Sequence, residues 1–257
     1  MPTPYHKQGF IVFVLAAALT AQGQPTTNAT LAAHAQQAFV RAQQEYAAHP
    51  DQADAAIRLG QATYDWALFA TNGDQRAGIA QAGVEACRQL VAREPRSAAG
   101  HLYLGMDYGE LAEAEEPSLA AYRLIRVIER EFKTAEDLDE RCDFGGPVRC
   151  LGLLYRDAPG WPISIGSRRK ARECLERAAT LAPDLPENQL NLVESYIRWR
   201  QAAEAEKAWQ KLVAIWPAAR TNLTGVTREF DWADWTTRRA AARKDFEKAF
   251  DRALEPQ

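Results

Sequence analysis

The four cysteines, Cys87, Cys142, Cys150 and Cys174, are the most reactive side chains of this 257-residue sequence. Cys142 and Cys150 flank Asp-Phe-Gly-Gly-Pro-Val-Arg, so a disulfide across that segment is one interpretation if the chain enters an oxidising compartment. The alternative is that Cys87 and Cys174 pack as small core residues and that the other two are unpaired thiols. No Cys-x-x-Cys pair occurs, which argues against a zinc or thioredoxin-type site.

Histidine and serine motifs also give little support to catalysis. His34, His49 and His101 are scattered, and neither His-Glu-x-x-His nor Gly-x-Ser-x-Gly is present. Ser167 precedes three cations at an expected helix start, where backbone amides can hold an anion. The ordinary interpretation is that Ser167 is an N-cap and that the cations are solvated. We therefore predict a protein that is not an enzyme and has no metal or cofactor.

The helices that would carry these residues follow a repeat between Leu151 and Pro217. Small, apolar and proline positions occur there at spacings of four, three and five residues, at Ala171, Leu175, Ala178 and Pro183. The same spacings recur 34 residues later, at Ala205, Trp209, Leu212 and Pro217. A small residue permits two helices to cross closely, larger apolar residues pack one turn away, and proline ends the second helix. A period of about 34 residues is that of the tetratricopeptide repeat (TPR).

The repeat template extends towards the N-terminus with interruptions. It places repeat starts near Ala53, Ala98, Gly145 and Pro186. We expect a long loop over Phe69 to Gly78, a helix from Pro117 to Phe132 followed by an irregular acidic stretch through Asp143, and an insertion around Ala158 to Pro162. The predicted fold is an all-α TPR-like helix-turn-helix solenoid with about four degenerate repeats.

Two further helices are expected outside the repeats. Thr30 to His49 has apolar residues at helical spacing and precedes Pro50, which ends it. Asn222 to Leu254 contains Trp235, Phe246 and Phe250 on one face, which is typical of a capping helix that covers the last repeat. The alternative, an amphipathic membrane-binding helix, is disfavoured because the opposite face mixes both signs of charge.

The fifth and ninth positions of each first helix should point into the concave groove of such a solenoid. These positions are Ile57 and Gln61, Leu102 and Met106, Arg149 and Leu153, and Leu190 and Glu194. Most are apolar, which disfavours the class of groove that clamps an acidic peptide tail. Either the protein's own helices or loop cover this groove, or it binds an apolar ligand or a partner's helix. The candidate ligand-binding residues are Ile57, Leu102, Met106, Arg149, Leu153 and Leu190.

Residues 1–23 have the pattern of a secretory signal peptide. Lys7 precedes an apolar run over Phe10 to Ala18, and Ala21-Gln22-Gly23 supplies small residues for cleavage. The run is about half of the ~20 residues that span a bilayer, so cleavage near Gly23 is favoured over an uncleaved anchor. Loss of Lys7 changes the formal charge from −3 to −4, and nucleic acid is not an expected partner of so acidic a chain. Residues 24–257 would form one solenoid domain that does not span the membrane.

A more specific resemblance covers about the central half of the chain. It rests on Gly-x-Leu-Tyr at 152–155, Ala-Pro-Gly-Trp-Pro at 158–162 and Lys-Ala-Arg-x-x-Leu-x-x-Ala at 170–178. This order resembles the bacterial TPR-like family that includes TatT, the T component associated with tripartite ATP-independent periplasmic (TRAP) transporters. The resemblance implies a periplasmic, all-helical protein, with homo-oligomers among its forms, that binds a solute-binding transporter subunit and shelters an apolar or organic-acid ligand. The chain lacks that family's lipoprotein cysteine near the cleavage region.

Two functions therefore remain open. The first is an auxiliary, T-component-like binding subunit, and the second is a generic TPR scaffold for protein–protein interaction without a small ligand. Tyr155, Arg156 and Trp161 lie beside the insertion and are the candidate partner surface, or else a packed corner. Neither the identity of a ligand nor the oligomeric state follows from the sequence.

Overall fold

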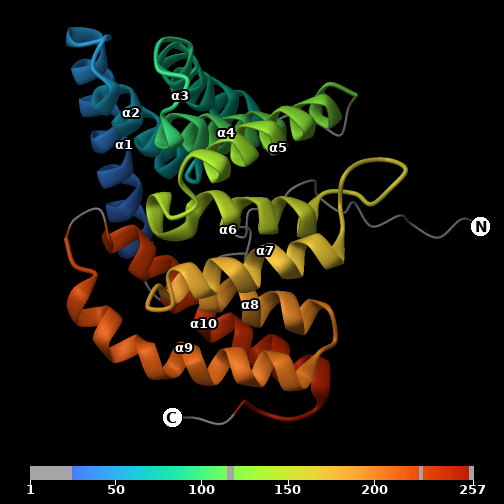
Figure 1. Ribbon diagram of the computed structural model, residues 1–257. Helices are drawn as coiled ribbons and strands as arrows, with labels where there is room; N and C mark the ends of the chain where they lie inside the picture. The colour runs from blue at the N-terminus through green and yellow to red at the C-terminus, as the bar shows by residue number, and fades with distance from the viewer. Residues whose placement is uncertain (1–24, 115–118, 226–227, 255–257) are drawn as a thin grey trace, which may run out of the picture.

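The computed structural model describes residues 25–114, 119–225 and 228–254, and the predicted signal peptide at 1–23 lies outside them. This described part of the chain is helical throughout (Figure 1). The helices are α1 (Pro25–Ala48), α2 (Ala53–Ala67), α3 (Gly73–Arg93), α4 (Ala98–Ala114), α5 (Leu119–Asp139), α6 (Cys142–Asp157), α7 (Arg168–Leu181), α8 (Pro186–Arg198), α9 (Ala202–Asn222) and α10 (Arg228–Phe250).

The four predicted helix pairs are α2 with α3, α4 with α5, α6 with α7, and α8 with α9. Three of the four repeat starts coincide with the first residue of a helix, at Ala53, Ala98 and Pro186. The third pair differs, because Asp143, Phe144 and Gly145 have positive φ angles of 46°, 55° and 80° before the regular part of α6 begins. The predicted all-α repeat architecture is therefore confirmed.

Glycines allow the first helix of a pair to approach its neighbours. A Cβ atom at Gly60 would lie 2.6 Å from the Cys87 sulfur, and one at Gly152 would lie 2.7 Å from the Leu175 side chain. A Cβ atom at Gly105 would lie 2.5 Å from the Phe132 ring. Such distances are too short for carbon in a packed interior, so hydrogen is the only side chain that fits these crossings.

Two predicted interruptions are wrong. The expected long loop over Phe69 to Gly78 is short, because α3 already begins at Gly73, where the Asn72 side chain accepts a hydrogen bond of 2.8 Å from the Gln75 amide. The expected irregular stretch after Phe132 is helical as far as Asp139. Asp137 and Asp139 are exposed while Phe132 and Ala135 continue the buried face of α5, so packing overrides the polar composition.

Pro217 does not end its helix, which is a third correction. Helix α9 continues to Asn222, and Ala219 in this extra turn is buried. Trp232 of α10 meets the same turn: its indole nitrogen donates to the Leu223 carbonyl oxygen at 2.7 Å, and its ring lies 5.3 Å from that of Trp216. The extended end of α9 therefore packs against α10, the next helix.

Helix α10 is the predicted capping helix, and it crosses the concave side of the last repeat next to α8 (Figure 1). Arg238 of α10 forms an ion pair with Glu194 of α8 at 2.8 Å and donates to the Asn191 side chain at 2.5 Å. At the other end of the same face, His34 of α1 lies 3.6 Å from Glu229 of α10. The first and last helices therefore approach each other across the groove.

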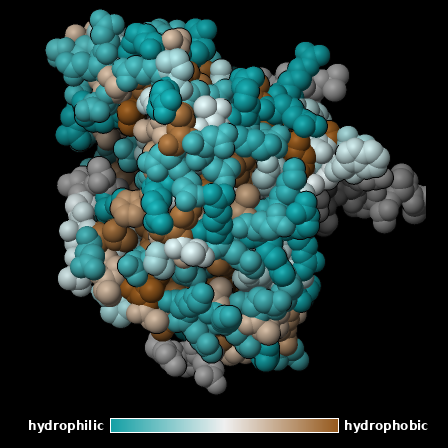
Figure 2. Space-filling model, viewed as in Figure 1, coloured by the Kyte–Doolittle hydropathy of each residue, from teal (hydrophilic) through white to brown (hydrophobic). Residues whose placement is uncertain are grey.

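The surface seen in Figure 2 is mainly hydrophilic, with hydrophobic side chains gathered in the seams between helices. None of the helices in the described ranges combines the length and the apolar composition that a membrane span requires. Trp161 and Ile163 are exceptions to the buried placement of apolar side chains, with exposed fractions of 88% and 65%. Both belong to the loop between α6 and α7, which projects from the solenoid in Figure 1.

Candidate functional site

A cavity of about 270 Å³ lies between the concave side of the solenoid and the first half of α10. Its walls come from α1, α2, α4, α6, the start of α8 and α10. The aromatic lining consists of Tyr64, Phe69, Tyr103, Phe144, Phe230 and Trp235. The acidic lining consists of Asp65, Asp143, Glu187, Asp231 and Asp234. The site therefore combines flat apolar walls with a concentration of carboxylates.

Only half of the predicted ligand-binding residues reach this cavity. Met106, Arg149 and Leu153 line it, as does Gln61 from the same set of groove positions. Leu102 and Leu190 are instead fully buried in the main core, and Ile57 is half-buried against that core. Leu102 and Leu190 therefore pack between helices and do not face the cavity.

Arg149 is buried and holds the unusual start of α6 in place. It donates to the carbonyl oxygens of Asp143 and Phe144 at 3.3 Å each, and its guanidinium lies 3.1 Å from the Asp143 carboxylate and 3.4 Å from that of Glu187. Burial alone would lower the pKa of Arg149, but these two carboxylates raise it above its ordinary value. Arg149 is therefore a structural cation at the cavity wall, and its charge is already paired with these carboxylates.

The two arginines of α10 that line the cavity, Arg228 and Arg238, also have carboxylate partners. Arg228 pairs with Asp231 at 2.6 Å, and its guanidinium lies 5.2 Å from the centre of the Phe144 ring. Arg238 pairs with Glu194 at 2.8 Å and with Asp234 at 3.2 Å. Burial raises the pKa of Asp234 to about 6 even though Arg238 opposes the shift.

Asp65, in the last turn of α2, differs from the other carboxylates of the cavity. Within the described ranges its carboxylate has neither a hydrogen bond nor an ion pair. Burial, followed by the charges of Asp231 and Asp143, raises the pKa of Asp65 to about 7, and Arg228 opposes this shift. The acid is therefore divided between its two protonation states near neutral pH and opens onto free space.

The residues missed from the sequence are Asp65 and the inner face of α10. The template considered only the fifth and ninth positions of each first helix, and Asp65 lies one turn beyond Gln61. Asp231 and Asp234 belong to the segment Asp-Trp-Ala-Asp-Trp, from which only Trp235 contributes to the predicted capping face. The spacing of these two acids, one helical turn apart, was the signal that could have placed them on one face.

The three residues of the candidate partner surface do not share a surface. Tyr155 is buried and donates its hydroxyl to Glu129 at 2.8 Å, while buried Arg156 pairs with Asp157 at 2.7 Å. Trp161 alone projects into solvent. The loop that carries it is held at its base, where the Gly166 amide donates to Pro159 and the Ser167 amide donates to Tyr155, both at 2.8 Å.

The other chemistry-bearing residues have structural partners. Ser167 is the N-cap of α7 and accepts from the Lys170 amide at 3.4 Å. Burial raises the pKa of the Cys142 thiol to about 11, and all four cysteines are free. His101 contacts Glu131 at 2.7 Å. In the described part of the chain, no group of histidine, cysteine and acidic side chains could hold a metal ion.

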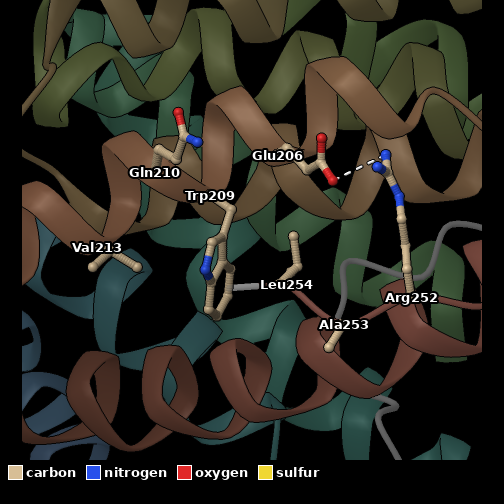
Figure 3. Close-up of a pocket in the computed structure, with 7 residues that line it drawn as sticks. All are labelled: Glu206, Trp209, Gln210, Val213, Arg252, Ala253 and Leu254. Carbon is tan, nitrogen blue, oxygen red and sulfur yellow. Dashed lines mark ion pairs between the residues drawn. The ribbon is translucent and has the colours of Figure 1, made fainter. Parts of the chain in front are cut away.

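A second cavity, of about 440 Å³, lies between α9 and the segment that follows α10 (Figure 3). Its charged groups, Glu206 and Arg252, neutralise each other in an ion pair of 2.9 Å. The indole nitrogen of Trp209 lacks a hydrogen-bond partner among the described residues. Its two charged side chains are paired with each other, so the cavity under α10 is the stronger candidate site.

Comparisons with known proteins support the fold. No protein-family model matches the chain, and no curated protein matches its sequence. Among solved structures, the chain is similar to a thermophilic TPR protein of Thermus thermophilus, with a TM-score of 0.59 and 21% identity over 84% of this chain and 98% of that one. At this identity the likeness concerns the fold alone, and the chain has the fold of an all-α TPR-like solenoid.

Proposed function

We propose that this protein is an exported TPR-like binding protein that encloses a small ligand between its concave surface and α10. The observation that carries the proposal is the cavity of about 270 Å³ that remains although α10 covers the groove. A helix that served only as a cap would place apolar side chains there and leave no space. Here the covering face carries Asp231 and Asp234 alongside its aromatic residues, which is a polar lining typical of a binding site.

An auxiliary role in transport is the finer part of this proposal. The resemblance of residues 152–178 to the TatT-containing family supports a periplasmic protein that works beside a solute-binding transporter subunit. Cleavage of residues 1–23 would release the protein into that compartment. The acid-rich lining favours an apolar ligand over an organic acid, because a carboxylate would meet like charges in the cavity.

Native mass spectrometry of the mature protein purified from the periplasm tests this function. We expect a bound mass that organic extraction removes, and a roughly tenfold lower occupancy in Met106→Trp, whose indole would fill the cavity. Ile163→Trp is the control, because it adds the same side chain at an exposed position outside the cavity. A wild-type protein without a bound mass, or Met106→Trp with unchanged occupancy, would contradict the proposal.

A scaffold that binds another exported protein is the second candidate, and the exposed loop favours it. Tryptophan is enriched among the residues that dominate protein interfaces, and Trp161 and Ile163 form an apolar tip that no part of the described chain covers. In a pull-down from periplasmic extract, Trp161→Ala should lose a partner that Arg169→Ala retains. Recovery of the same partners by both variants would show that the loop is not the docking surface.

A further inference from the structure

We infer that the cavity under α10 binds an organic cation, with an ammonium or guanidinium group next to Asp65 and an apolar body against the aromatic walls. This inference rests on the proposed function, because it names the class of ligand for the same cavity. It excludes the organic acids that the family resemblance also implies.

The cavity is lined by more carboxylates than guanidinium groups, and the ion pairs among them show which charges are left for a ligand. Five carboxylates and three guanidinium groups line the cavity. Each guanidinium already has a carboxylate within ion-pair distance: Arg149 has Asp143, Arg228 has Asp231, and Arg238 has Glu194 and Asp234. An anionic ligand would find no free cation among these residues, whereas a cationic ligand would find Asp65 without a partner.

Asp65 also lies where added positive charge would relieve repulsion. It faces Asp231 across the cavity from α10 and Asp143 from the start of α6, and the charge of each disfavours ionisation of the Asp65 carboxyl. Arg228 opposes this effect, but it is paired with Asp231. A ligand cation between these acids would supply the counter-charge that the chain itself does not provide.

The aromatic walls favour the same class of ligand. The faces of aromatic rings attract cations, and the guanidinium of Arg228 already lies 5.2 Å from the Phe144 ring centre. Phe69 and Phe230 meet in an edge contact with ring centres 6.4 Å apart, so the segment after α2 and helix α10 contribute adjoining surfaces for an apolar body. A carboxylate ligand would be repelled by the electron-rich faces of these rings.

The affinity for a cation should rise with pH through the neutral range. The groups that face Asp65 are Arg228, Asp231, Asp234 and Arg238 from α10, Asp143 and Arg149 from α6, Glu187 from α8, Tyr103 from α4 and Tyr64 beside it on α2. Burial and neighbouring charges raise the pKa of Asp65 to about 7, and burial raises that of Asp234 to about 6. Both acids are protonated in mild acid and charged in mild base, so the cavity becomes more negative as the pH rises.

Three probes of similar size and different charge test the inference by titration calorimetry: 2-phenylethylamine, 2-phenylethanol and 3-phenylpropionate. Near pH 8 we expect the amine to bind about tenfold more tightly than the alcohol, and the acid to bind least. Asp65→Asn should weaken amine binding about tenfold and leave alcohol binding unchanged. Asp54→Asn is the matched control, because it removes the same charge from an exposed position on the same helix.

The outcomes separate this inference from the function on which it rests. Strongest binding of the acid, equal binding of amine and alcohol, binding of no probe, or full amine affinity in Asp65→Asn would overturn the assignment to cations. If the acid binds most tightly, or the amine and the alcohol bind equally, and Met106→Trp abolishes that binding, the cavity is a ligand site of another class. If Met106→Trp leaves the binding of every probe unchanged, the ligand does not occupy this cavity and the proposed function fails as well.

Discussion

Carboxylates with raised pKa values occur in two different settings in this structure. Asp65, with Asp231 and Asp234, borders the cavity under α10. Asp107 and Glu110 of α4 are instead buried where α4 packs against α2 and α3. Burial is the first cause of the raised pKa in each group, and it raises that of Glu110 to about 7 against the effect of Arg76.

The surroundings of the two groups are different. Neither oxygen of Asp107 has a hydrogen-bond partner among the described residues, and a Cβ atom at Gly83 would overlap its carboxylate. No space remains there for a ligand, so Asp107 is part of the packed core. Asp65 has the same kind of shift but opens onto 270 Å³ of free volume. A raised pKa therefore identifies a candidate site only when the acid also faces space that a ligand can enter.

The largest expected effect concerns an arginine that lines the cavity. Arg149→Met should lower the free energy of unfolding by about 3 kcal/mol, because Asp143 and Glu187 would lose their buried partner. Arg169→Met, which removes a largely exposed arginine paired with Glu173, should change stability by less than about 0.5 kcal/mol. Urea denaturation measures both. Equal effects of the two substitutions would mean that the cavity wall does not depend on its arginines.

A smaller effect tests whether the packing around Asp107 leaves any space. Gly83→Ala should destabilise the protein by about 2 kcal/mol, because the added methyl group meets the Asp107 carboxylate and the Thr63 side chain. Gly78→Ala on the same helix has free space around it and should stabilise the protein by about 0.5–1 kcal/mol. Thermal unfolding of the pair gives the contrast. An unchanged stability of Gly83→Ala would show that the packing around Asp107 can also accommodate added atoms.

A third test concerns the pH dependence of stability. Because the pKa of Asp65 rises to about 7 on folding, the folded state holds its proton longer, and stability contributed by this carboxyl is lost as the pH rises from about 4 to 7. Asp65→Asn should be more stable than the wild type near pH 8 and equal to it near pH 4, because the amide has no charge to bury. Denaturation at both pH values measures the difference. If the stability of the wild type and of Asp65→Asn depends on pH in the same way, the pKa of Asp65 is not raised in the folded state.

The sequence alone determined the repeat architecture to within a few residues. The starts of α2, α4 and α8 follow from the spacing of small and apolar residues, because the crossing of two consecutive helices is a local contact. The same spacing identified Met106, Arg149 and Leu153 as groove residues. Local composition was a poorer guide: the acidic residues after Phe132 and Pro217 both indicated helix ends, and tertiary packing carried α5 and α9 beyond them.

The tertiary structure alone decided which carboxylates face one another. Asp65 belongs to the first repeat and Asp231 to the last helix, and no periodic pattern relates two segments so far apart in the chain. Their proximity depends on the path of α10 across the concave side, fixed by Arg238, Glu194 and Asn191. Burial and like charge then shift the pKa of Asp65, because both depend on distance in space and not on distance along the sequence.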